Sequence, residues 1–192
     1  KSVAFLEGYR SVANAYNGKD DLIILGSHGA GGGKKLGVGS NAGKILRTAK
    51  SPVLIVQKAI PKPFSFKTIV FASGLEPDTH EALNRLLQFA DKVGAENLHF
   101  IEVTTPHNFR PTSVVLGEMQ AFIAKHDFKN IRLHNYNHYT VEAGIVEFAE
   151  SINADLIAIA NHGRTDLSSL FIESIPENLV KQAAFPVLSI RV

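Results

Sequence analysis

Apolar and polar positions follow two periods along this chain. Short apolar runs, typical of buried strands, alternate with longer segments in which apolar residues recur every three or four positions, typical of helices. The short runs predict strands at residues 22–25, 53–56, 68–72, 98–103, 130–136, 155–160 and 187–191. The longer segments predict helices at residues 5–18, 42–49, 79–93, 112–126 and 139–152, and a last helix that ends before residue 186. Strands that alternate with helices of about 10 to 15 residues form parallel βαβ units, so we expect an α/β fold with a doubly wound parallel sheet.

Three of the predicted helices also indicate which side chains form the core. In residues 79–93 the apolar side chains share one helical face, and Gly94 follows as a helix stop. The residues predicted to be buried are Leu83, Leu86, Leu87, Ala90 and Val93 in this helix, Val115, Met119, Phe122 and Ile123 in the next, and Ile145, Phe148, Ala149 and Ile152 in the third.

The end of the chain repeats the pattern of its beginning at a fixed offset. Asp155 follows Asp21 by 134 residues, and the same interval separates Gly163 from Gly29, Ser174 from Ser40, and Pro186 from Pro52. Chance does not keep four such positions in register, so we interpret the chain as containing two copies of one unit.

A glycine-rich segment follows the first predicted strand. Gly26 and Gly29 are followed, after nine further residues, by Gly39 and Ser40 at the start of a predicted helix. Glycine lets the backbone turn and approach a ligand closely, while the free N–H groups and positive dipole end of a helix favour an anion. This order of strand, loop and helix predicts a phosphate-binding loop. The alternative is a glycine-rich turn that binds nothing.

The full spacing Gly-x2-Gly-x9-Gly-Ser, together with its repetition, resembles the universal stress protein family. Nucleotide-binding members carry this motif between the fourth strand and the last helix of a flavodoxin-like domain, a fold of the adenine-nucleotide α-hydrolase-like kind. The repeat resembles the tandem two-domain members of the family. The resemblance implies that the first loop holds ATP or a related nucleotide, with no metal required. The residues implied are Gly26, Ser27, His28, Gly29, Gly39, Ser40 and Asn41.

The second loop departs from this motif. It keeps Gly163 and Ser174 but has Ala160 and Glu173 in place of the other two glycines. Glu173 would set a negative charge where phosphates lie, and Ser174 with Glu177 predicts a capping box that already satisfies the helix start. Gly74 also stands where the first strand of the family usually ends with an aspartate. We therefore expect a degenerate second site that no longer binds triphosphate.

The offset also predicts the domain boundaries. Residues 1–58 correspond to the C-terminal part of a first universal stress domain, residues 59–66 form a short linker stiffened by two prolines, and residues 67–192 form a complete second domain. The first unit has no counterpart of residues 67–134, so we expect a longer parent protein. A nucleotide in this fold lies across the carboxyl ends of several strands. We therefore expect the 192-residue chain to bind ATP weakly, and binding to return when an upstream segment is restored.

The last strand of each unit predicts how the units assemble. Residues 53–56 and 187–191 end their units as short apolar strands, and a strand left at a sheet edge exposes unpaired N–H and C=O groups. The family resemblance implies that the two strands pair antiparallel in an intramolecular pseudo-dimer. It also suggests a homo-oligomer formed through the same strands.

Composition narrows the class of partner. The chain is 45% hydrophobic and 20% charged, with a net charge of +2 and both signs interspersed, so we expect no binding to nucleic acid or to an acidic membrane surface. The chain has no cysteine, which excludes disulfides and fits a reducing cytosol. No apolar run approaches the roughly 18 to 20 residues of a membrane span. We expect a cytoplasmic protein.

Eight histidines raise the question of a metal site. His134 and His138 are the densest pair, but residues four apart in a strand lie about 13 Å apart, too far for one ion. His28 and His162 occupy the same place in the two loops and are interpreted as turn residues. We expect no metal, no catalytic residues and no enzymatic activity, because neither a serine–histidine–acid arrangement nor a carboxylate pair is evident.

The sequence thus predicts a nucleotide-binding regulatory module of the stress response, in which the first loop is competent. The alternative is a structural or protein-interaction module in which both loops are simple turns. Slow ATP hydrolysis is a third, less favoured interpretation, because no general base or metal-binding carboxylate can be named near the loop.

Overall fold

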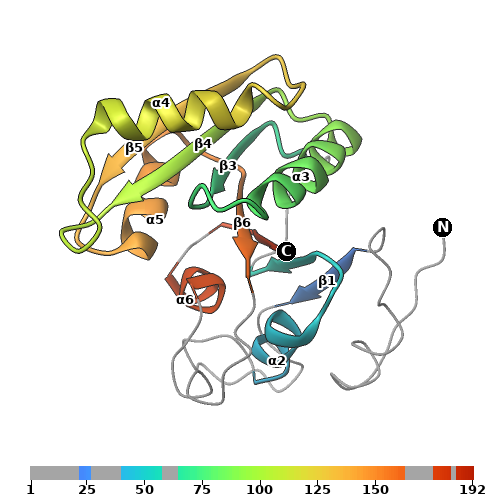
Figure 1. Ribbon diagram of the computed structural model, residues 1–192. Helices are drawn as coiled ribbons and strands as arrows, with labels where there is room; N and C mark the ends of the chain where they lie inside the picture. Colours follow the sequence, from blue (N-terminus) through green and yellow to red (C-terminus); the bar gives the residue numbers. More distant parts are fainter. Residues whose placement is uncertain (1–21, 27–39, 58–64, 163–174, 183–184) are drawn as a thin grey trace.

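The strands form one mixed sheet (Figure 1). The computed structural model describes residues 22–26, 40–57, 65–162, 175–182 and 185–192. Its strands are β1 (Ile23–Gly26), β2 (Val53–Val56), β3 (Thr68–Ala72), β4 (Asn97–Thr104), β5 (Ile131–Asn137), β6 (Leu156–Asn161) and β7 (Val187–Arg191). They lie in the order β1-β2-β7-β6-β3-β4-β5, and every neighbouring pair is parallel except β2 and β7. The predicted α/β class and largely parallel sheet are confirmed.

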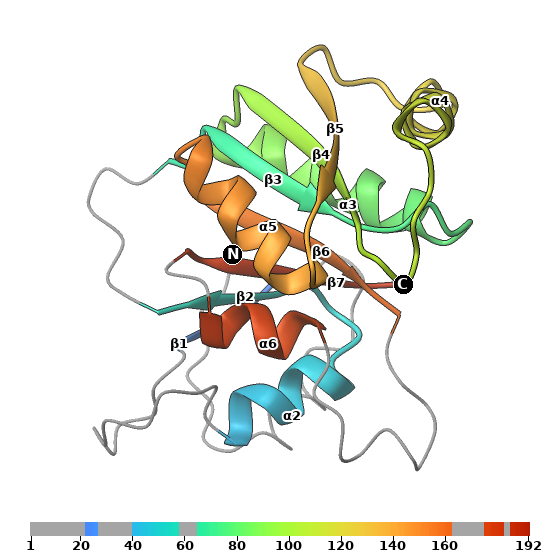
Figure 2. The ribbon, with the colours of Figure 1, turned by 90° about the vertical axis from the view of Figure 1, so that its left-hand side faces the viewer.

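Helices cover both faces of the sheet (Figure 2). On one face α2 (Ser40–Thr48), α5 (Val141–Ser151) and α6 (Ile175–Gln182) share a core with β-strand side chains. On the other face lie α3 (Thr79–Val93) and α4 (Thr112–Ile123). The predicted helix stop is confirmed, because Gly94 ends α3 in the left-handed conformation with φ of 71°. The helix predicted at residues 5–18 lies outside the described residues.

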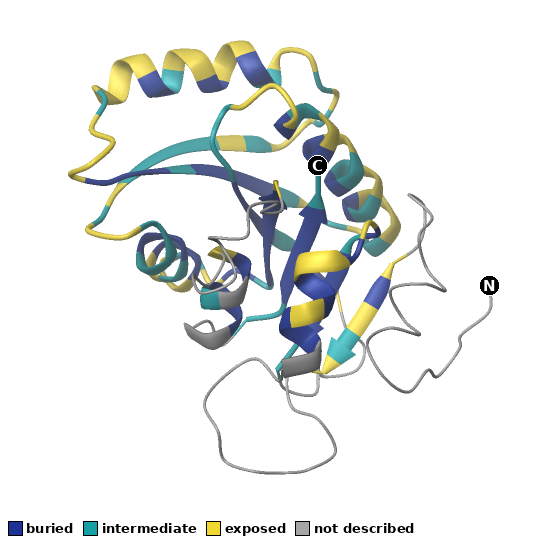
Figure 3. Cartoon of the chain, turned by 60° about the horizontal axis from the view of Figure 1, so that its bottom comes forward, coloured by how far each residue is buried: buried dark blue, intermediate teal, exposed yellow. Residues whose placement is uncertain are grey.

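Burial agrees with the predicted helical faces (Figure 3). Leu83, Leu86 and Ala90 of α3 are fully buried, while Leu87 and Val93 are partly buried at the edge of the same core. Phe66 belongs to the predicted linker, yet it is 2% exposed and packs against Phe89 at a ring-centroid distance of 6.1 Å. The chain that leads into β3 therefore contributes to the core of the second unit.

The antiparallel contact between β2 and β7 confirms the predicted pairing of the two final strands. Its register places Leu54 opposite Leu188, which is 54 plus 134. The flanking pairs are Val53 with Ser189 and Ile55 with Val187. With the offset of 134, Val53 is equivalent to Val187 and Ile55 is equivalent to Ser189. Each of these residues therefore pairs with the equivalent of the other. A twofold axis through the Leu54–Leu188 pair produces such a reciprocal register.

Two boundaries differ from the sequence prediction. The helix expected to reach residue 126 ends at Ile123, and the next residues turn while His126 turns toward α3 to contact His80. The last helix before β6 begins at Val141 rather than at residue 139, because the Thr140 side chain accepts a hydrogen bond from the backbone N–H of Ala143 and caps it.

Candidate functional site

The first glycine-rich loop is framed as the sequence predicts. β1 ends at Gly26 and α2 begins at Ser40, so a strand leads into the loop and a helix start follows it. Asn41 is the second residue of α2, and the first turn of this helix contains no acidic residue. Ser27, His28, Gly29 and Gly39 lie outside the described residues. The two described ends present a helix N-terminus free of carboxylates, which is compatible with an anion.

The strand of this first loop lies at an edge of the described sheet. β1 pairs with β2, whereas the equivalent strand β6 pairs with both β7 and β3. Ile24 is consequently 63% exposed, while the equivalent residue Ala158 is fully buried. The carboxyl end of β1 thus has one neighbouring strand within the described part of the chain, and that of β6 has two.

The residue before the second loop links elements that are far apart in the sequence. Asn161 ends β6 and is buried, and its Nδ2 donates hydrogen bonds to the Leu46 carbonyl at 3.1 Å and to Ser189 Oγ at 3.2 Å. Gln57, just after β2, donates in turn to the carbonyl of Val180. Leu46 and Val180 are again 134 residues apart. These two hydrogen bonds were not predicted, because side-chain contacts between residues far apart in the sequence leave no periodic signal.

Two carboxylates gather around His162, the residue that follows β6. His162 follows β6, and its Nδ1 lies 2.9 Å from Asp78 Oδ2 and its Nε2 lies 3.8 Å from Glu76 Oε2. A Cβ added to Gly74 would meet both carboxylate oxygens of Glu76 at 2.5 Å. The side chain of Glu76 therefore covers the backbone at the position where the family pattern has an aspartate. Gly163, Glu173 and Ser174, with the predicted capping box, lie outside the described residues.

The space at the carboxyl ends of β3, β4 and β6 is small. A cavity of about 80 Å³ is bounded there by Ser73, Val103 and Ala160, with Ile145 of α5 and Ile175 of α6 closing it. Small-molecule pockets in proteins usually measure about 300 to 1,000 Å³. This cavity, bounded by described residues alone, is smaller than that range.

Four histidines form two pairs in the second unit. His99 Nδ1 lies 3.0 Å from His134 Nε2, and His80 Nδ1 lies 2.7 Å from His126 Nε2. Burial lowers the pKa of all four imidazoles below the usual value. Within the described ranges no cluster of three or more metal-ligating side chains occurs. The rings of each pair are stacked and join neighbouring elements.

His138 takes a different partner from His134. Its Nε2 lies 3.4 Å from Glu147 Oε2 on α5, and its Nδ1 accepts a hydrogen bond from the backbone N–H of Thr140. His138 and its neighbours also line a larger cavity between the ends of β4 and β5. This cavity was not predicted, because its walls come from two loops whose residues carry no motif.

No helix in the described part of the chain is long and apolar enough to cross a membrane.

Comparisons with known proteins agree with the fold and with the family resemblance. The model of the universal stress protein family matches residues 17–57 and 65–191. A universal stress protein of Synechocystis is 27% identical over 179 residues, which cover 91% of this chain and 59% of the relative.

Solved structures show the same architecture. A universal stress protein from Archaeoglobus fulgidus superposes with a TM-score of 0.72 at 22% identity, covering 95% of this chain and 64% of that one. A universal stress protein solved in complex with cAMP gives a TM-score of 0.55 at 20% identity, covering 67% of this chain and 98% of that one. The chain therefore spans less than two thirds of the length of the Synechocystis and Archaeoglobus relatives. Because the family model matches most of its residues, the chain belongs to the universal stress protein family.

Proposed function

We propose that the chain is part of a tandem universal stress protein that binds ATP or a related nucleotide at the loop 26–41 and acts as a regulatory module in the cytoplasm. The observation that carries the proposal is the frame of this loop. β1 ends at Gly26, α2 begins at Ser40, and the first turn of α2 has no acidic residue. A helix N-terminus after a glycine-rich turn is a favourable place for phosphate.

The tandem arrangement is supported by the register of the two final strands. Leu54 faces its own equivalent, Leu188, in the β2–β7 ladder, and the pairs on either side of it are reciprocal under the offset of 134 residues. A structural neighbour in the same family was solved with cAMP, which supports a nucleotide as the ligand class. In our proposal the second unit no longer binds nucleotide, because Glu76 and Asp78 place carboxylates at its mouth and its cavity is small.

We propose a regulatory role instead of a catalytic one. The segment 26–41 contains no aspartate or glutamate that would hold a magnesium ion or activate a water molecule. The output would then be a change in conformation or association when the nucleotide binds.

The test is to denature the purified, naturally encoded protein and identify released small molecules by chromatography and mass spectrometry. We expect an adenine nucleotide in an amount comparable with the protein. If no nucleotide is released, and calorimetric titration with ATP is also silent, the nucleotide-binding function is wrong.

A second candidate is a protein-interaction module in which neither loop binds a ligand. It is favoured by the apolar edge strand, where Ile24 is 63% and Leu22 is 40% exposed. The absence of released nucleotide would favour this alternative.

A further inference from the structure

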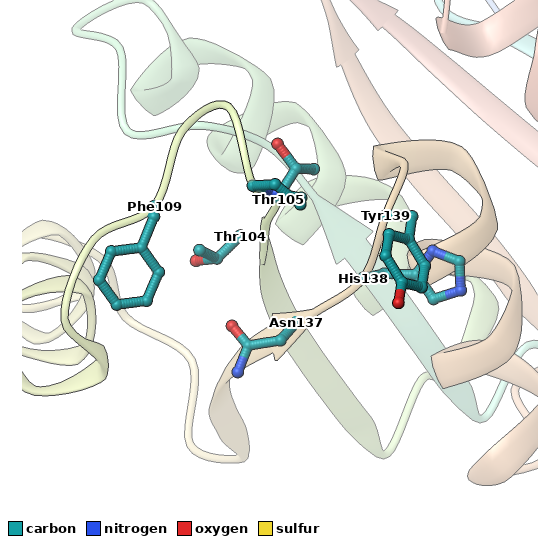
Figure 4. A pocket seen from close by; sticks show the side chains of 7 residues that line it. Thr104, Thr105, Phe109, Asn137, His138 and Tyr139 are labelled. Atoms are coloured by element: carbon teal, nitrogen blue, oxygen red, sulfur yellow. The ribbon is translucent and has the colours of Figure 1, made fainter.

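A cavity of about 470 Å³ lies between the loop that follows β4 and the end of β5 (Figure 4). Thr104 and Asn137, opposite each other in the β4–β5 ladder, form its floor. Phe109 stands on one side, and His138 and Tyr139 stand on the other. The cavity shares no residue with the loop 26–41 or with the small cavity of the second unit, so a ligand bound here would be independent of the proposed function.

The wall that carries Phe109 is held in place by hydrogen bonds. The Asn108 side chain accepts from the backbone N–H and, at 2.8 Å, from the hydroxyl of Thr105, while the Asn108 N–H donates to the Thr105 carbonyl at 3.1 Å. Arg110, next to Phe109, is paired with Glu102 and with Glu118. Phe109 is 74% exposed on this clamped loop. Phe109 therefore offers an exposed aromatic face at the rim of the cavity.

The opposite wall is equally constrained. The backbone N–H of His138 donates to the Thr104 carbonyl at 3.0 Å, which joins this wall to the floor. Behind it, Gly144 of α5 packs so closely that an added Cβ would lie 2.9 Å from the Cβ of His138. Tyr139 is 84% exposed, and its ring meets that of His138 edge-on at a centroid distance of 6.2 Å. The backbone of both walls is therefore held in place, which lowers the entropic cost of binding.

The floor offers a hydrogen-bonding group that the described residues leave unused. Thr104 Oγ1 accepts from Asn135 Nδ2 at 2.7 Å, and Asn135 Oδ1 accepts from Thr112 at 2.9 Å. The next residue on the same face, Asn137, is exposed, and its side-chain amide makes no hydrogen bond to another described residue. A carboxamide has two donor hydrogens and one acceptor oxygen, so it can pair with another amide through both.

The charge around the cavity selects for a neutral ligand. Among the described residues no lysine or arginine lines it, and the neighbouring cation, Arg110, lies between the carboxylates of Glu102 and Glu118. An anionic ligand would gain no unpaired positive charge from this lining, and burying it would be costly. We propose that this cavity is a binding site for a small neutral aromatic carboxamide, with its ring between Phe109 and Tyr139 and its amide paired with Asn137.

The probe for this site is benzamide, compared with benzoate, its charged isostere. Binding is followed by saturation-transfer and 1H–15N correlation NMR, with the side-chain amide signal of Asn137 as the local reporter. We expect benzamide to bind with a dissociation constant on the order of 1 mM, as suits so small a ligand, and to shift that signal. Benzoate should bind at least about tenfold more weakly, which corresponds to the loss of one good polar interaction.

Asn137→Leu keeps the side-chain size and should weaken benzamide binding about tenfold. Phe109→Ala should weaken it by about fivefold, the effect of losing one aromatic contact. Gln88→Leu is the matched control, an exposed amide on α3, and should leave binding unchanged. Thermal melting of each variant checks that the fold is retained. The proposal is overturned if benzamide does not bind, if benzoate binds equally well, or if Asn137→Leu has no greater effect than Gln88→Leu.

Discussion

β1 and β6 occupy equivalent positions in the proposed sequence repeat, yet they differ in burial along most of their length. Ile24 of β1 is 63% exposed, while its equivalent Ala158 in β6 is fully buried. The cause is the neighbourhood: β6 lies between β7 and β3, whereas β1 has only β2 beside it among the described strands. One sequence pattern thus gives an interior strand in one unit and an edge strand in the other. The neighbours of a strand decide its burial as much as its own residues do.

The largest effect is expected at the seam, the antiparallel ladder between β2 and β7. Leu54 and Leu188 are 4% and 1% exposed, and they face each other across the β2–β7 ladder. Leu188→Ala and Leu54→Ala should each lower the free energy of unfolding by about 2 to 5 kcal/mol, because each leaves a cavity in the core. Urea denaturation should show one cooperative transition in both variants.

A different outcome at the seam would indicate that the two proposed units fold independently. If Leu54→Ala left the unfolding of the second unit unchanged while Leu188→Ala destabilised it, the two units would fold independently. The comparison of equivalent strands within one sheet would then fail.

Exchanging the equivalent residues of β1 and β6 sharpens the comparison. Ala158→Ile copies Ile24 into a fully buried position and should cost about 1 to 3 kcal/mol through overpacking. Ile24→Ala copies Ala158 into an exposed position and should change stability by no more than about 0.5 kcal/mol. Thermal or urea unfolding measures both. If Ile24→Ala lowered the free energy of unfolding more than Ala158→Ile does, other residues would have to cover β1 in solution.

Acid should affect the second unit more than the seam. Burial lowers the pKa of His80, His99, His126 and His134, so the unfolded chain binds more protons than the folded one near and below their usual value. Their contribution to stability is complete above the unfolded value, about 6.5, and is lost as pH falls through the lowered folded values.

Hydrogen exchange at decreasing pH provides the measurement. Protection should fall first in β4 and β5, which the His99–His134 pair joins, before it falls in β2 and β7. His134→Phe should reduce the dependence of stability on pH, while Gln88→Leu, at an exposed position of α3, should not. An unchanged pH dependence in His134→Phe would show that this pair is not the acid-sensitive element.

Much of the fold could be predicted from periodicity, but the sites between elements could not. The strands at Thr68–Ala72 and Val187–Arg191 and the helix at Thr79–Val93 have the predicted bounds, because their apolar spacing and their stop residues are local. The cavity beside Asn137 and the link from Asn161 to Leu46 depend on contacts between residues distant in sequence. Such contacts leave no pattern in a single chain. The histidine pairs were missed for the same reason, since each joins two different elements.

The central claim is that the first loop binds nucleotide and the second does not. The most direct test is calorimetric titration of the naturally encoded protein with ATP, alongside Gly39→Glu, which copies Glu173 into the first loop. Gly117→Glu, at an open and exposed position of α4, is the matched control. We predict that ATP binding is lost in Gly39→Glu, because a carboxylate then faces the phosphates, and is unchanged in Gly117→Glu and in Glu173→Gln. Unchanged affinity in Gly39→Glu, or loss of binding in Glu173→Gln, would contradict the account.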